Sequence, residues 1–147
     1  SGTIDTFVRV IITKSWQDKE GKKNTTLSPD LIELNFLTDN GWQIANAQST
    51  KERTVLYYTK AVAAGDTTPA LSDTLRINPS IASDVTKHVT ESEKGKSITY
   101  TYKYNGYTFH IDAEVDAVQT HNAKDAIKSA WGVDINVSDD ETTMSLQ

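Results

Sequence analysis

The sequence predicts an all-β fold, an antiparallel β-sandwich with one short helix in the C-terminal half. Three observations lead to this prediction. Residues 4–16 are dense in β-branched and aromatic side chains, which fit a pleated sheet. Residues 97–118 alternate between apolar and polar side chains around Asn105-Gly106, as in a half-exposed β-hairpin. The clear spacing of an amphipathic helix occurs at residues 122–131.

The first segment, residues 4–16 (IDTFVRVIITKSW), predicts a central strand. Apolar side chains occur at both parities, with Val8 and Val10 on one side and Phe7 and Ile11 on the other. A strand with apolar groups on both sides is typical of a sheet that is covered on both faces. Residues 17–24 then indicate a charged loop.

The middle of the chain predicts several strands. Residues 31–37 and 42–47 flank Asn40-Gly41, and this dipeptide favours a type I′ turn, so we expect a hairpin. Residues 53–61 indicate a further strand, and residues 75–77 indicate a short one that ends before Pro79. Residues 80–88 have weak helical spacing and are not assigned.

The hairpin at residues 97–118 has a predicted register. A two-residue turn pairs Tyr104 with Tyr107, and counting outward gives the further pairs Tyr102–Phe109, Tyr100–Ile111 and Ile98–Ala113. The apolar face continues through Val115 and Ala117, and the opposite face is polar. We therefore expect one dry and one solvated face, as in a sandwich.

The helix at residues 122–131 has predicted ends. Asn122 is a favourable N-cap, Asp125 suits the first turn, and Gly132 follows at the C-terminal capping position. Its apolar stripe consists of Ala123, Ala126, Ile127, Ala130 and Trp131. Residues 133–137 indicate a short strand. We expect one β-sandwich domain at residues 1–138, followed by a polar, acidic tail at residues 139–147. The polar stretch begins at Ser138, and we expect it to fray.

Bulk composition limits the classes of function. The chain has 147 residues, a formal net charge of -5 and no cysteine. The negative charge argues against nucleic acid as a partner, and the absence of cysteine excludes disulfides and thiolate metal sites. No apolar run approaches the ~20 residues of a membrane span, so no membrane insertion is expected in this span. The chain begins without a methionine, so we expect a processed or cut chain whose export signal lies outside it.

The sequence does not predict a catalytic or metal site. Asp112, Glu114 and Asp116 share one strand face, but alternate residues stand ~6.6 Å apart, and calcium needs its oxygens within ~2.6 Å. We therefore interpret them as a solvated acidic face. His88, His110 and His121 lack close ligand spacing, and no nucleophile elbow or phosphate loop is present. We expect no enzyme activity and no cofactor.

The tyrosines raise an alternative, since aromatic rings can stack on sugars. Tyr100, Tyr102 and Tyr104 share the parity of Ile98 on the apolar side of the hairpin, so we assign them to the core and its rim. A carbohydrate-binding surface is therefore the less favoured interpretation of these residues.

Several segments resemble the TasA/camelysin family, exported by Gram-positive bacteria through a SipW-type signal peptidase. They are residues 2–10 (GTIDTFVRV), 57–60 (YYTK) followed by Gly65, 75–77 (LRI), 113–119 (AEVDAVQ), and residues 122–134 with Trp131-Gly132-Val133-Asp134. The resemblance covers most of the chain. It implies a jelly-roll-like sandwich, an extracellular or cell-surface location, and self-association into biofilm matrix fibres or association with homologous matrix proteins.

In such fibres an N-terminal strand of one subunit completes the sheet of the next. The family pattern has another strand before Gly2-Thr3, where this chain begins. We therefore expect an exposed edge along residues 4–16 that accepts an extended segment. The candidate assembly residues are Ile4, Phe7, Val8, Val10 and Ile12. Two alternatives stay open, a cell-surface adhesin or ligand-binding module and a camelysin-like metalloprotease, although no zinc-binding pattern supports the latter.

Overall fold

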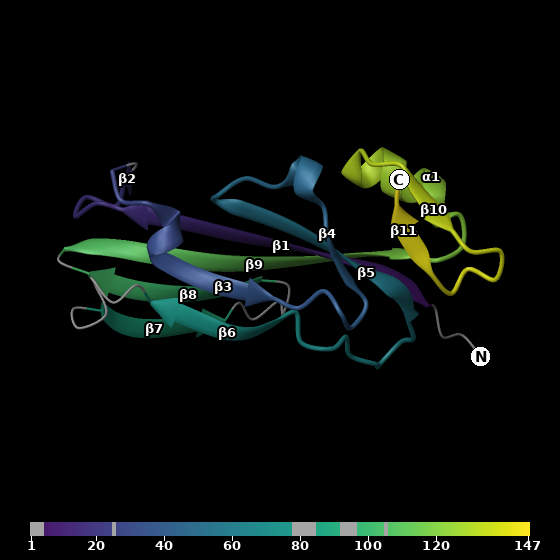
Figure 1. The fold of residues 1–147 in the computed structure, drawn as a ribbon, viewed down its shortest axis with the longest axis horizontal. Helices are drawn as coiled ribbons and strands as arrows, with labels where there is room; N and C mark the ends of the chain where they lie inside the picture. The colour runs from purple at the N-terminus through teal and green to yellow at the C-terminus, as the bar shows by residue number, and fades with distance from the viewer. Residues whose placement is uncertain (1–4, 25, 78–84, 92–96, 105) are drawn as a thin grey trace.

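A computed structural model describes residues 5–24, 26–77, 85–91, 97–104 and 106–147 (Figure 1). A seven-stranded antiparallel sheet forms its centre, in the order β4-β5-β1-β9-β8-β7, with β2 added to β1. The strands are β1 (Thr6–Gln17), β2 (Lys23–Asn24), β4 (Trp42–Ile44), β5 (Arg53–Val62), β7 (Val85–Glu91), β8 (Ser97–Tyr104) and β9 (Tyr107–Gln119). With one short α-helix besides, the predicted all-β class is confirmed.

The strand β1 lies in the middle of this sheet. It pairs with β5 on one side and with β9 on the other. Val10, Ile12 and Trp16 enter one apolar cluster, whereas Phe7 and Ile11 enter a second. Because side chains alternate along a strand, the two clusters lie on opposite faces of the sheet. The prediction of a central, doubly covered strand is confirmed.

The first face is covered by a two-stranded sheet of β3 (Ile32–Phe36) and β6 (Ser72–Ile77). Trp16 is fully buried there, with its ring centroid 4.9 Å from that of Phe109. Its indole Nε1 donates a hydrogen bond to the Ser28 carbonyl at 2.9 Å, so the polar end of the ring is also satisfied. Ile32 of β3 completes this layer, which makes the structure a sandwich.

The second face is covered by the end of the chain. The helix α1 (Ala123–Trp131) and a ribbon of β10 (Ile135–Val137) and β11 (Met144–Leu146) lie together at one end of the sheet (Figure 1). Ile127 and Ile135 are fully buried against Phe7 and Tyr57. The remainder of this face carries polar residues such as His110, which lies within 3.3 Å of Thr101.

The hairpin of β8 and β9 has the predicted register, from Tyr104 opposite Tyr107 to Ile98 opposite Ala113. Phe109 and Ile111 are buried on its apolar side. Further along β9 the cover ends, and Val115 is 40% exposed. The alternating pattern therefore sets the face of each residue, and the layer above decides how much of that face is dry.

The hairpin predicted for residues 31–47 is wrong. β3 pairs with β6, and β4 pairs with β5, so the two segments belong to different sheets. Gly41 has a φ of 106°, but Asn40 does not have the positive φ of a type I′ turn. Ile32 and Trp42 are both buried in the cluster between the two sheets, so the connection crosses from one layer to the other. Of the unassigned residues 80–88, 85–88 belong to β7, and 80–84 lie outside the described residues.

The expectation that residues 138–147 form a fraying tail is also wrong. β11 pairs with β10, and Met144 is only 4% exposed. The turn between them is closed by Asp140, whose Oδ1 accepts hydrogen bonds from the Ser138 and Thr142 hydroxyls, both at 2.7 Å. These bonds hold the pKa of the Asp140 carboxyl below its ordinary value. The acidic residues that indicated a tail instead build a turn.

The helix ends differ in how well they were predicted. Gly132 ends α1 in the left-handed region with a φ of 72°, as expected. Asn122 precedes the helix, but it has a φ of 58° and its side chain makes no capping hydrogen bond. Ala123 and Ile127 are buried, whereas Ala126 and Ala130 are exposed, so the apolar stripe is narrower than predicted.

Candidate functional site: an open sheet edge and its groove

The predicted assembly edge along β1 is wrong for the residues that the structure describes. Phe7, Val10 and Ile12 are buried, and Val8 is partly buried. Both edges of β1 are hydrogen-bonded, to β5 and to β9, so the strand offers no free backbone. Ile4, the remaining predicted residue, lies outside the described part of the chain.

The outer strands of the seven-stranded sheet are β4 and β7. At the two ends of β4, Ala45 donates to the Val55 carbonyl and the Gly41 carbonyl accepts from the Thr59 N–H, both at 2.8 Å. Hydrogen-bonded and non-hydrogen-bonded pairs alternate in an antiparallel ladder, so the N–H and C=O groups of Trp42 and Ile44 point outward. Within the described chain, no residue is hydrogen-bonded to these outward backbone groups.

The open edge at β4 is fixed in place by contacts of Trp42 and Gly41, and it carries no charged side chain. The indole Nε1 of Trp42 donates to the Pro69 carbonyl at 3.0 Å, and its ring lies 5.1 Å from that of Tyr58. A Cβ at Gly41 would come within 2.7 Å of the Tyr58 ring, so only glycine allows this approach. Residues 40–50 (NGWQIANAQST) contain no charged side chain. Natural sheet edges are commonly protected by lysine or proline, and β4 has neither.

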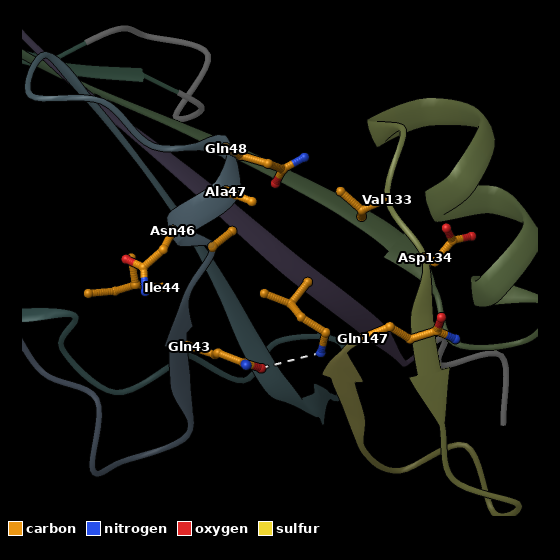
Figure 2. A pocket seen from close by; sticks show the side chains of 10 residues that line it. Gln43, Ile44, Asn46, Ala47, Gln48, Val133, Asp134 and Gln147 are labelled. Carbon is orange, nitrogen blue, oxygen red and sulfur yellow. Dashed lines mark hydrogen bonds between the residues drawn. The ribbon is translucent and has the colours of Figure 1, made fainter.

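A groove of about 520 Å³ lies between β4 with its following turn, Asn46–Gln48, and the C-terminal ribbon (Figure 2). Gln43 spans it, because its Oε1 accepts a hydrogen bond from the Leu146 backbone N–H at 3.3 Å. The lining residues are Gln43, Ile44, Ala45, Asn46, Ala47, Gln48, Val133, Asp134, Leu146 and Gln147.

The groove offers hydrogen bonds rather than reactive groups. Four of its side chains are amides, which both donate and accept. Gln48 accepts from the buried Tyr57 hydroxyl at 2.9 Å, and burial raises the pKa of that phenol although Arg9 opposes the rise. The charged lining residue, Asp134, is paired with Lys128 at 3.2 Å. Such a lining suits an uncharged chain segment with free backbone groups.

The acidic face of β9 is used in part for structure. Asp116 accepts a hydrogen bond from Arg9 Nη2 at 2.7 Å, and the same guanidinium lies 4.7 Å from the Trp131 ring centroid. Asp112 and Glu114 alternate with it along the strand, as expected. Among the described residues, no group of three or more His, Asp or Glu side chains could hold a metal ion.

The three histidines occupy separate places. His110 lies on β9 with its Nε2 3.1 Å from the Gln17 side-chain oxygen. His121 lies just before α1, with its Nδ1 3.4 Å from Glu141. His88 belongs to β7, where its backbone is in register with Thr101. No helix in the described part of the chain is long and apolar enough to cross a membrane.

Lys14 is a buried residue that the sequence analysis did not single out. It lies on the first face of the sheet between Ile12 and Trp16, and it is 8% exposed. Burial lowers the pKa of its ammonium group, and the Asp30 and Glu33 carboxylates oppose this effect. The available signal was its parity, since Lys14 shares the side of β1 that carries Val10 and Ile12.

Comparison of the chain with models of known protein families, with curated proteins and with solved structures finds no match.

Proposed function

We propose that this chain is a structural subunit of the extracellular surface that assembles by pairing of sheet edges, and that it is not an enzyme. The observation that carries the proposal is the open seven-stranded sheet, whose outer strands β4 and β7 lie at its opposite sides. An edge that pairs with a different edge of the next copy makes a head-to-tail contact. Contacts of this kind extend into filaments when the rotation between copies does not close a ring.

Two further observations support the proposal. The outward groups of Trp42 and Ile44 are a template for strand addition, and no charge in residues 40–50 opposes an incoming strand. The resemblance to exported fibre subunits suggests a biofilm matrix as the setting, with copies of this chain or homologous matrix proteins as partners. The position of the edge differs from the expected one, since β4 takes the place predicted for β1.

The test is size-exclusion chromatography with light scattering over a range of protein concentrations, followed by electron microscopy of the largest species. We expect concentration-dependent multimers of the wild-type chain. Ile44→Pro removes an outward N–H while leaving the hydrogen bonds to β5, so we expect it to be folded and monomeric. Circular dichroism checks the fold of the variant. A wild-type chain that stays monomeric at every concentration overturns the proposal.

The groove beside β4 favours a second candidate, a cell-surface ligand-binding module. Its volume of about 520 Å³ and its amide lining are suited to a small polar ligand. This function predicts saturable binding to a glycan or a host protein by a chain that remains monomeric. Casein cleavage blocked by a chelator would instead support a metalloprotease.

A further inference from the structure

Tyr57 fixes the orientation of one amide in the groove, that of Gln48. The Tyr57 ring is fully buried, and its hydroxyl donates a hydrogen bond to Oε1 of Gln48 at 2.9 Å. Burial raises the pKa of the phenol, so the hydroxyl keeps its proton at neutral pH, and the neighbouring Arg9 guanidinium can only donate to the phenol oxygen. Gln48 therefore turns its oxygen toward Tyr57 and its Nε2 away from it.

The Gln48 amide lies beside apolar groups. Figure 2 shows its side chain extending from the turn after β4 toward the ribbon, and Val133 extending from the ribbon toward it. Ala47 adds a methyl group to the lining, and the carboxylate of Asp134 is paired with Lys128 at 3.2 Å. The groove thus combines an oriented hydrogen-bond donor with small apolar side chains and a neutralised charge. Such a combination suits an uncharged carbonyl that carries a methyl group.

We propose that the groove binds an acetamido group of an N-acetylated sugar. The acetyl oxygen accepts a hydrogen bond from Nε2 of Gln48, and the acetyl methyl packs against Val133 and Ala47. The sugar hydroxyls bind a second amide, Gln43, whose Nε2 remains a donor because its Oε1 accepts from the Leu146 N–H. This inference rests on the ligand-binding candidate above and names its ligand class, and it does not depend on edge assembly.

The side-chain amide of Gln48 gives a direct readout of binding. Isotope-labelled protein is titrated with chitotriose, a trimer of N-acetylglucosamine, and NMR follows the side-chain and backbone amide signals of the groove. We expect a saturable shift of the Gln48 side-chain signals. Cellotriose, the glucose trimer of the same linkage, has a hydroxyl in place of each acetamido group. We expect it to bind roughly tenfold more weakly or not at all.

Variants separate the donor from its support. Gln48→Glu keeps an acceptor for the Tyr57 hydroxyl but removes the donor, so we expect the Kd for chitotriose to rise roughly tenfold to a hundredfold. Gln119→Glu makes the same change at an exposed position outside the groove lining, and we expect its Kd to be unchanged. Tyr57→Phe lets the Gln48 amide turn, so we expect a smaller rise, and circular dichroism checks that this variant is folded.

The outcomes separate this inference from the other proposals. If chitotriose leaves the groove signals unshifted at millimolar concentration, or if Gln48→Glu binds it as tightly as the wild type, the inference is wrong. If cellotriose binds as tightly as chitotriose, the acetamido group is not recognised, whereas the ligand-binding candidate stands. Each of these results leaves edge assembly to its own test, the concentration dependence of the wild-type mass.

Discussion

The two faces of the seven-stranded sheet are covered in different ways. On the first face, Ile32 of β3 packs with Trp16 and Phe109, β6 pairs with β3, and both strands come from the middle of the chain. On the second face, a nine-residue helix and two three-residue strands from the last part of the chain cover Phe7 and Tyr57. A layer can therefore be built from short elements when each contributes one or two fully buried side chains.

The second cover also depends on a charged group. Arg9 extends from β1, binds Asp116 at 2.7 Å, and lies 4.7 Å from the Trp131 ring centroid at the end of α1. Its Nε is buried and has no hydrogen-bond partner in the described residues. The ring of Tyr57 lies 5.8 Å from that of Trp131. Cation–π contact and aromatic packing thus help to fix the helix on the second face.

The largest effect is expected on the first face. Trp16→Ala removes a fully buried ring and its hydrogen bond, so we expect the free energy of unfolding to fall by about 3–5 kcal/mol. Urea unfolding measures the loss. Trp16→Phe keeps part of the ring packing and is expected to lose less. A loss below about 1 kcal/mol for the alanine variant would mean that this layer collapses around the gap or contributes little.

An intermediate effect is expected on the second face. Met144→Ala truncates a side chain that is 4% exposed, and we expect a loss of about 2–3 kcal/mol in the free energy of unfolding. The exposed neighbour Ser145→Ala is the matched control, with an expected change within about 0.5 kcal/mol. If both variants changed the free energy of unfolding by the same small amount, residues 138–147 would not contribute to the core and would behave as a tail.

The smallest expected effect is a gain, rather than a loss, in the free energy of unfolding when Lys14 on the first face is replaced. Its pKa is lowered in the folded chain, so the unfolded chain binds the proton more tightly and stability is lost as the pH falls below 10.5. We expect Lys14→Met to stabilise the fold by about 1 kcal/mol at pH 7, with the gain shrinking as the pH approaches 10.5. Urea unfolding at both pH values checks this. The exposed Lys22→Met is the control, and a destabilised Lys14→Met would show that the ammonium is well paired.

The local parts of the fold could be predicted, and the distant pairings could not. The register of β8 and β9 follows from Asn105-Gly106 and simple alternation, because both strands adjoin the same turn. The pairing of β3 with β6, and the bridge of Lys60 with Thr143 that ties the C-terminal ribbon to β5, join segments far apart in the chain, which the apolar pattern of either segment does not specify. For the same reason the open edge was predicted on β1, whereas both edges of that strand are paired, one with β5 and the other with β9. The groove combines residues near Gln43 with residues near Leu146, so no single motif marks it.

The place of β1 between β5 and β9 also determines when the fold can form. Arg9 and Asp116, which face each other across two adjacent strands, are 107 residues apart in the chain. The first of these two strands to be synthesised therefore waits for the second, and its edge toward β9 stays unpaired during that interval. Closing so long a loop before its contacts are rewarded slows folding and lengthens exposure to aggregation. For this chain, the completion of its central sheet is a late event.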